Sequence, residues 1–257
     1  SAAIAVSVLL MIICYVTVRG IGSVSLEFLT TVTSARKGTV GIAGNIVNTL
    51  YIIMITLVIA TPIGVGSAIY LNEYAKPGKI VRIIEFTTET LSGIPSIVYG
   101  LFGMLFFTKT LKMGYSMMSG ACTLAIMILP LIMRTAEEAL KSVPDSYREA
   151  SFGLGAGKLR TIFKIVLPSA VPGILSGVIL ATGRVVGETA ALLFTAGTIA
   201  KVAGLMDSGR TLAVHMYALS SEGLYMNQMY ATGVILMLIV LLINGCSGMI
   251  AKKIAKK

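Results

Sequence analysis

The chain has 257 residues, of which 56% are hydrophobic and 12% are charged, and its mean hydropathy is +0.89. A soluble protein of this size cannot bury so much apolar surface, and the same composition excludes a disordered chain. The net charge is +10, but Lys and Arg lie in short segments between long apolar runs. We therefore predict an integral membrane protein with no nucleic-acid partner.

Six apolar runs are candidates for membrane-spanning helices, which need about 20 residues each. In chain order they are Ala2–Val18, Ile46–Leu71, Leu91–Thr108, Met113–Met133, about Ile165–Gly183, and a run within Leu224–Ala251 that is densest at Ala231–Ile243. Runs of this length favour helices over the short alternating strands of a barrel. We predict an all-α polytopic membrane protein with six transmembrane helices, forming a single transmembrane domain over residues 1–257.

The distribution of Lys and Arg predicts the orientation, because cytoplasmic loops collect basic residues. With the N-terminus inside, 13 of the 21 basic residues fall in cytoplasmic segments, seven fall outside, and Arg184 stands at the end of a span. The terminal lysines, Lys252, Lys253, Lys256 and Lys257, then lie inside against anionic lipid. We expect both termini in the cytoplasm.

Two segments are too long to be simple connectors. The first is a charged cytoplasmic loop at about residues 134–164, and the second includes Thr189–Ala200, which is apolar but too short to span. We expect the second to be a re-entrant or interfacial piece on the outer side.

The charged loop contains the pattern of a short helix, a glycine hinge and a second helix. Ser142–Asp145 has the form of a capping box, and a helix is expected to follow through Phe152 until Gly153, Gly155 and Gly157 end it. A second amphipathic stretch, Leu159–Val166, leads into the next span. An exposed amphipathic helix either docks into a groove on a partner or lies on lipid headgroups, and spacing alone leaves both alternatives open.

This loop resembles the EAA loop of ABC importer permeases. That pattern reads EAA, three residues, Gly, nine residues and I-x-L-P, and the matching residues here are Glu149, Ala150, Ser151, Gly155, Ile165, Leu167 and Pro168. Ser151 departs from the pattern, which has Ala at that position. In this family the loop forms the coupling helix that sits in a cleft of the ATP-binding subunit.

The resemblance extends over about residues 20–245. Ala68–Ala75 is similar to the stretch YLxEYA, Gly93–Gly103 to GVPSIVYGLFG, and Gly183–Ala196 to RAxGETAPLLFTA, with Ala191 in place of a common Pro. Together these motifs resemble the A-subunit permease of the phosphate-specific transport (Pst) system. The C-subunit shares Arg-x-x-Gly-Glu-Thr, but the letters ALLFTA favour the A type.

The resemblance implies an ABC importer type I permease (EAA-loop, MetI-like) fold in a prokaryotic plasma (inner) membrane. It implies these partners: a homologous C-type permease, two ABC ATPase subunits, and an extracytoplasmic phosphate-binding protein. The chain is then a non-catalytic subunit without a cofactor of its own. Neither Gly78-Lys79 nor Gly157-Lys158 completes the phosphate-binding pattern GxxxxGK[ST], so we expect ATP and Mg on the ATPase chain.

Arg184 and Glu188 are candidates for the substrate path. They share a helix face if the fifth span continues through both, and Gly173-x-x-x-Gly177 on nearly the same stripe predicts close packing against another helix. A guanidinium matches the oxygens of phosphate, and Glu188 would hold it extended and temper its affinity. The alternative is an ion pair that only fixes helix register.

Two other functions remain open at the level of the sequence. The chain could serve an importer for another oxyanion or small solute, or it could be a membrane scaffold or signalling component that does not conduct. The single histidine, His215, has no neighbouring ligands in the sequence and is expected to be structural.

Overall fold

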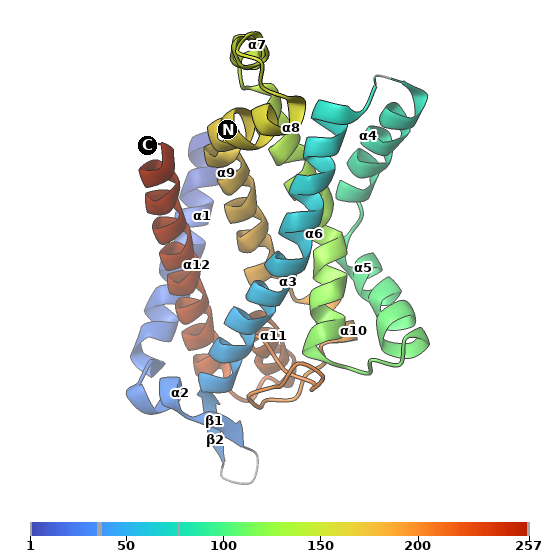
Figure 1. Ribbon diagram of the computed structural model, residues 1–257. Coiled ribbons are helices and arrows are strands. Elements are labelled where there is room, and N and C mark those ends of the chain that lie inside the picture. The colour runs from blue at the N-terminus through green and yellow to red at the C-terminus, as the bar shows by residue number, and fades with distance from the viewer. Residues whose placement is uncertain (1, 35–37, 77, 256–257) are drawn as a thin grey trace. The chain divides into compact units, whose positions relative to one another are not determined.

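The computed structural model describes residues 2–34, 38–76 and 78–255 (Figure 1). Its helices are α1 (Ala2–Gly20), α2 (Leu26–Thr30), α3 (Ala43–Ile69), α4 (Lys79–Ser92), α5 (Ser96–Gly103), α6 (Met117–Lys141), α7 (Asp145–Gly153), α8 (Lys158–Thr161), α9 (Leu167–Val186), α10 (Ala190–Thr195), α11 (Leu212–Glu222) and α12 (Met226–Ala255). A 3-10 turn follows α1 at Ile21–Ser23, and π-helical segments occupy Tyr70–Tyr74, Met104–Thr110 and Ile162–Val166. The strands are β1 (Val32–Ser34) and β2 (Thr39–Ile42).

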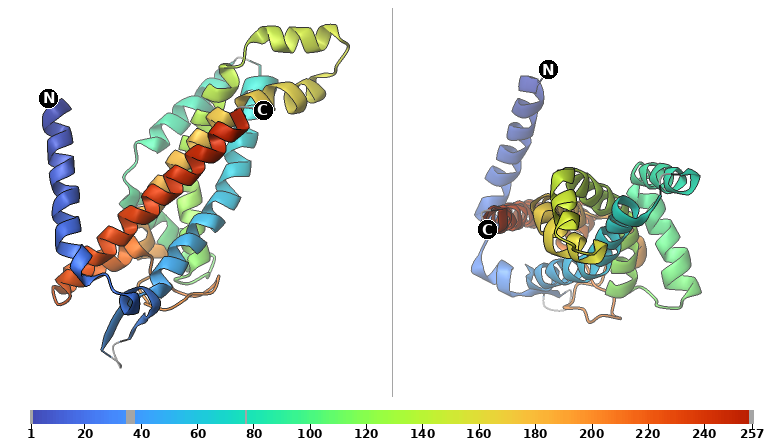
Figure 2. Two further views of the ribbon diagram at one scale, coloured as in Figure 1. Left: turned by 90° about the vertical axis from the view of Figure 1, so that its left-hand side faces the viewer. Right: turned by 45° about the horizontal axis from the view of Figure 1, so that its top comes forward.

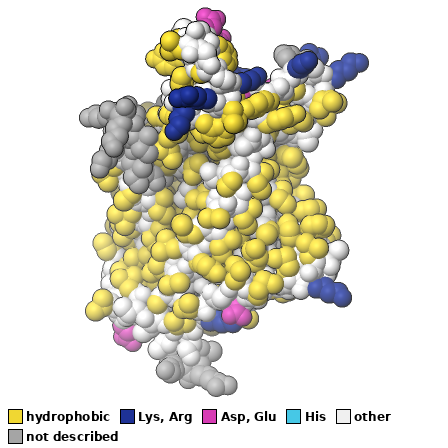
Figure 3. Space-filling model, in the orientation of Figure 1, with side chains coloured by type: hydrophobic (Ala, Val, Ile, Leu, Met, Phe, Trp, Pro, Cys, Tyr) yellow, Lys and Arg dark blue, Asp and Glu magenta, His cyan; other side chains and the backbone are white. Residues whose placement is uncertain are grey.

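Five helical segments of the described chain are long and apolar enough to cross a membrane. They are Ala3–Ser23, Ala43–Tyr74, Met117–Lys141, Lys158–Val186 and Met226–Cys246, and a sixth span results if Lys79–Ser92 and Ser96–Thr110 are counted as one broken span. The predicted all-α polytopic fold is therefore confirmed. Large apolar side chains remain exposed in four of these segments, as expected for helices that lipid surrounds, whereas Met117–Lys141 is mostly buried. Hydrophobic side chains are spread widely over the face in Figure 3.

The predicted bounds of the third span are wrong, because the helix is broken inside the predicted run Leu91–Thr108. One helix, α4, ends at Ser92 and the next, α5, begins at Ser96. Pro95 has no backbone N–H and disfavours helical geometry at Ile94, and Gly93 is a poor helix former. The amphipathic α4 carries charged residues among its apolar ones, so its sequence does not form a continuous apolar run.

The structure divides into two compact units. Unit 1 comprises Ser1–Ile55, Ser96–Thr123 and Val186–Leu241, and unit 2 comprises Thr56–Pro95, Leu124–Val185 and Leu242–Lys257. Helices α3, α6, α9 and α12 contribute residues to both units, α9 with Val186 alone in unit 1. The single permease domain over residues 1–257 stays a prediction. Among the basic residues counted for orientation, Arg36, Lys37, Lys256 and Lys257 lie outside the described residues.

Unit 1 has a core formed by Phe28, Ile42, Leu212, Ala231 and Ile235. The strands β1 and β2 pair antiparallel, and the apolar segment Thr189–Ala200 contains α10, which packs against α5. A Cβ atom at Gly100 would lie 2.8 Å from the Cα of Ala191, so only glycine permits this approach. The short apolar helix is therefore covered by protein.

Unit 2 is built around α6 and α9, whose backbones approach closely. A Cβ atom at Gly173 would lie 2.6 Å from the Cβ of Ala139, and one at Gly177 would overlap the side chain of Thr135. This contact confirms the close packing predicted from the Gly-x-x-x-Gly pattern. A cluster of buried side chains surrounds it, formed by Ala68, Leu71, Met133, Ala136, Ala139, Leu140, Val143, Val166, Ala170 and Ile174.

Candidate functional site

Helix α7 forms where the sequence predicts it, but its start differs from the prediction. The expected capping box is wrong, since the Ser142 hydroxyl donates to the carbonyl of Ala139 at 2.7 Å and the N-cap residue is Pro144. The carboxylate of Asp145 stands in the first turn, where the helix dipole favours a negative charge. The proline and the acidic residue therefore set the beginning of α7.

Gly155 ends α7 in the way that its sequence position predicts. Its φ is +81°, a conformation that strains any residue with a Cβ atom. The N–H of Gly155 donates to Phe152 O at 2.9 Å, and the N–H of Ala156 donates to Ser151 O at 3.1 Å. These two bonds form a Schellman motif, which satisfies the last carbonyls of the helix and turns the chain back towards α8.

A buried pair of hydroxyl groups joins α7 to α8. The Ser151 Oγ and Thr161 Oγ1 atoms are 2.8 Å apart, and the two residues are 4% and 1% exposed. Because Thr161 donates its proton to Gly157 O, the Ser151 hydroxyl is the donor within the pair. The departure from the EAA pattern at Ser151 is therefore accommodated by a hydroxyl partner at Thr161.

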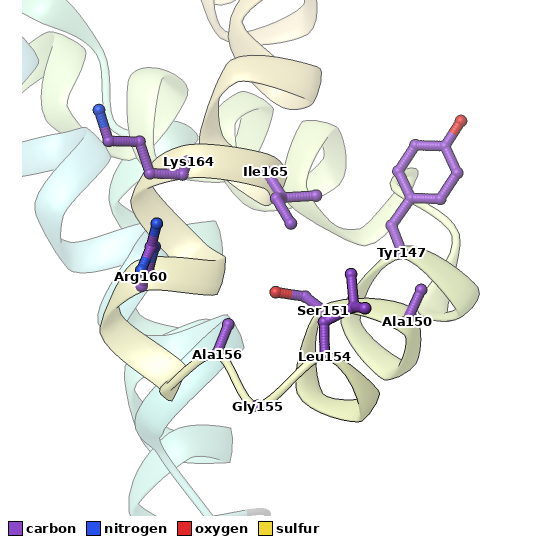
Figure 4. Close-up of a pocket in the computed structure, with 9 residues that line it drawn as sticks. All are labelled: Tyr147, Ala150, Ser151, Leu154, Gly155, Ala156, Arg160, Lys164 and Ile165. Atoms are coloured by element: carbon purple, nitrogen blue, oxygen red, sulfur yellow. The ribbon is translucent and has the colours of Figure 1, made fainter.

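The two arms of this loop enclose a cleft of 520 Å³. Figure 2 shows α7 and the helical segment that begins with α8 joined by a turn, and in Figure 4 Ser151 and Ile165 point into the space between them, whereas Tyr147 and Lys164 extend away from it. Tyr147, Ala150, Ser151, Leu154, Gly155, Ala156, Arg160, Lys164 and Ile165 line the cleft. Four residues of the predicted EAA set thus meet here, while Glu149 is exposed and Leu167 and Pro168 begin α9.

Arg148 is the residue of this site that the sequence reasoning missed. Its Nη2 donates to Glu73 Oε1 at 2.8 Å and to Leu140 O at 3.1 Å, and its Nη1 donates to Val143 O at 2.9 Å and Asp145 Oδ1 at 3.1 Å. The side chains of Arg148 and Glu73 are 15% and 8% exposed. One guanidinium therefore ties α7 to the end of α6 and to the π-helical segment after α3. Glu73 lies 75 residues away in sequence, so no spacing could reveal the pair.

The predicted common helix face of Arg184 and Glu188 is wrong. Helix α9 ends at Val186, so Arg184 lies in its last turn and belongs to unit 2, while Glu188 lies beyond the helix in unit 1. The Glu188 carboxylate accepts the N–H of Ala191 at 3.1 Å and so caps α10. Gly187 separates the two helices, because glycine weakens a helix interior. The roles of both residues in a substrate path stay a prediction.

A polytopic helical protein with a glycine-terminated helix between two of its spans has the architecture of ABC importer permeases. Residues 60–256 match the family described as binding-protein-dependent transport system inner membrane component, and the chain belongs to this family.

Similar proteins support the same class. The chain is 37% identical over 237 residues to the probable ABC transporter permease protein YqgI of Bacillus subtilis, covering 87% of this chain and 81% of that protein. It is 35% identical over 232 residues to the phosphate transport system permease protein PstA of Yersinia pestis, covering 88% and 78%. These matches confirm the resemblance to PstA-type permeases.

A solved structure has the same fold. It is the structure of a bacterial alginate ABC transporter in complex with an alginate pentasaccharide-bound periplasmic protein. The structural match has a TM-score of 0.71 and 14% sequence identity, and it covers 99% of this chain and 96% of the matched chain. The type I ABC importer permease fold is thereby confirmed.

Proposed function

We propose that this permease subunit belongs to an ATP-driven importer of inorganic phosphate, in which it forms half of the translocation path and couples to the ATPase through α7. The observation that carries the coupling is the exposed apolar surface of the loop: Tyr147, Phe152 and Leu154 are 51%, 46% and 89% exposed. A short helix with such side chains suits a groove on a partner protein. The phosphate substrate is supported by the similarity to PstA permeases.

The internal contacts of the loop suit it to transmit movement. The Schellman turn at Gly155 and the hydroxyl pair join α7 to α8, and Arg148 joins α7 to α6. A displacement of α7 would therefore move the ends of the spans with it. Closure of the ATPase pair would push α7 and open the path to the outer side by alternating access.

The complete importer would contain the partners that the family resemblance implies. We expect a homologous C-type permease beside this chain, two ATPase subunits that carry ATP and Mg, and an external phosphate-binding protein. The complex would lie in the prokaryotic plasma membrane with α7 and both termini in the cytoplasm. Arg184 and Glu188 would each contribute to the phosphate path.

Reconstitution tests the substrate. The complex is purified from its native membrane, its chains are identified, and it is placed in proteoliposomes with the external binding protein that accompanies it. Phosphate is expected to stimulate ATP hydrolysis and to accumulate with ATP, whereas sulfate, methionine or alginate is not. Stimulation by one of the latter solutes instead would assign the importer to another substrate. Phosphate uptake by a strain without its own importer would exclude a non-conducting scaffold.

Cross-linking tests the coupling surface. In a background with Cys14, Cys122 and Cys246 replaced by Ala, Leu154→Cys is expected to cross-link to the ATPase chain. Leu26→Cys provides the control, because Leu26 is also highly exposed, at 78%, but lies in unit 1. Equal cross-linking from both positions, or none from Leu154→Cys in an active complex, would contradict docking through α7.

A further inference from the structure

A cavity in unit 1 is lined by a buried cation, Arg210, that forms no ion pair among the described residues. Its volume is 450 Å³, and its polar lining side chains are Thr33, Ser34, Thr39, Arg210, Glu222 and Tyr225. Arg210 is only 8% exposed and its Nε has no hydrogen-bond partner. The ion pairs found among the described residues do not include its guanidinium.

The backbone at Arg210 is held firmly, so the position of this cation is built into the fold. The N–H of Arg210 donates to Ile199 O at 3.1 Å, and Asn48 Nδ2 donates to Arg210 O at 3.1 Å. The N–H of Leu212 donates to Thr49 Oγ1 at 2.9 Å. The start of α3 therefore fixes the backbone on both sides of Arg210. The burial of the Arg210 side chain is thus not the result of a flexible surface loop.

A guanidinium remains charged at neutral pH, and a buried charge without a partner destabilises the fold. Burial lowers the pKa of Arg210, while Glu222 acts on the same pKa in the opposite direction. Lys201, in the same unit, is compensated by Asp207 at 3.2 Å. Glu222, which lines the same cavity, offsets only part of the Arg210 charge because the two groups form no ion pair in the described structure, so an anionic occupant of the cavity would complete the compensation.

Glu222 gives the cavity a second, distinct property. It is the last residue of α11, where the helix dipole disfavours a carboxylate, so its charge does not stabilise this helix end. It lies at the cavity but forms no ion pair with Arg210 in the described structure. A ligand between the two groups would accept hydrogen bonds from Arg210 and donate one to Glu222.

We propose that this cavity binds a protonated tetrahedral oxyanion, inorganic phosphate, as a subsite of the importer separate from Arg184 and Glu188. The inference rests on the proposed function, and it names Arg210 as a phosphate contact. The planar guanidinium presents paired N–H donors to two oxygens, and the hydroxyls of Ser34 and Tyr225 supply further donors. Phosphate retains an acidic proton near neutral pH and can satisfy Glu222, whereas sulfate has none and would be repelled.

Direct binding tests the subsite. The purified permease complex, free of the external binding protein, is titrated with radiolabelled inorganic phosphate at constant ionic strength. Arg210→Gln is expected to weaken phosphate binding at least about tenfold, as the loss of a charged hydrogen-bond donor predicts. Lys201→Gln removes a positive charge from the same unit outside the cavity and is expected to leave binding unchanged. Equal binding by the wild type and Arg210→Gln would overturn the proposal.

Glu222→Gln is expected to fold normally, because the Glu222 side chain is exposed and lies at a helix end that disfavours the negative charge of Glu222. It is expected to admit sulfate as a competitor of phosphate, while the wild type excludes sulfate. Unchanged selectivity in Glu222→Gln would overturn the proposal even if Arg210→Gln failed to assemble. A complex that takes up phosphate but binds none without its binding protein refutes the subsite alone, and a complex that takes up no phosphate refutes the proposed function.

Discussion

The Arg148–Glu73 contact provides the sharpest test of how α7 is held. In Arg148→Met the Glu73 carboxylate, 8% exposed, loses its cationic partner, and the carbonyls of Leu140 and Val143 lose a donor. Removing one partner of a buried ion pair costs about 3–5 kcal/mol. Asn72 still donates to Glu73 Oε1 at 2.9 Å, so we expect a value near the lower limit, about 3 kcal/mol.

A double-mutant cycle measures the interaction itself. Glu73→Gln keeps an acceptor for Arg148 but removes the charge, so it should cost about 1–2 kcal/mol. The double variant should cost less than the sum of the two single variants, by about 1–3 kcal/mol, because neither charge is then left alone. The unfolding free energy of the detergent-purified complex is measured by denaturant titration for all four proteins.

Arg134→Met is the matched control, because Arg134 also pairs with two carboxylates but is 59% exposed. Exposed pairs contribute about 0–1 kcal/mol. Additive costs in the cycle, or an Arg148→Met protein no less stable than Arg134→Met, would refute the reasoning. If α7 transmits movement, Arg148→Met should also lower phosphate uptake per ATP hydrolysed, whereas Arg134→Met should not.

Three further predictions concern single positions. Gly155→Ala should destabilise the fold by about 1–2 kcal/mol, because the backbone at Gly155 has a positive φ. Gly157→Ala is the control and should be neutral or slightly stabilising, because φ at Gly157 is −73°. Equal melting temperatures of the two variants would contradict this prediction. Gly177→Ala should cost about 1–3 kcal/mol by overlap with α6, whereas Gly183→Ala meets no atom within 4 Å and should be tolerated, as the unfolding free energies of both variants will show. Burial and a neighbouring guanidinium lower the pKa of His215, which lies outside the candidate spans, to about 3. The contribution of neutral His215 to stability is therefore fully present above pH 6.5 and is lost as the pH falls below that value. The free energy of unfolding should fall by at most about 1.4 kcal/mol per pH unit. Melting curves from pH 7 to 4.5 should show a weaker pH dependence for His215→Gln than for the wild type.

Short-range patterns predicted much of the candidate site. That a glycine ends α7 could be expected because only a residue without a Cβ atom adopts a positive φ readily, although the sequence left Gly153, Gly155 and Gly157 open and the helix includes Gly153. The close contact of α6 and α9 could be expected from two glycines on one helix stripe, although the partner helix could not. The capping box at Ser142 failed because that hydroxyl had a nearer carbonyl of the preceding helix available.

The remaining features of the site depend on contacts between distant segments. The break before α5 has a local cause in Gly93 and Pro95, yet the charged residues of α4 kept this helix out of the apolar run that the sequence predicts. Glu188 was expected to hold Arg184, but it caps α10 instead, because the helix that would have aligned the two side chains ends at Val186.

The sequence by itself determined that this protein is embedded in a membrane, that its spans are helical, and that glycines end α7, because hydropathy and backbone conformation are properties of neighbouring residues. Only the tertiary structure decided that Arg148 meets Glu73, and that Arg210 is buried beside an open cavity without an ion pair among the described residues. Both features depend on which distant segments pack together. Whether a buried charge destabilises the fold or binds a ligand depends on the groups that this packing places around it.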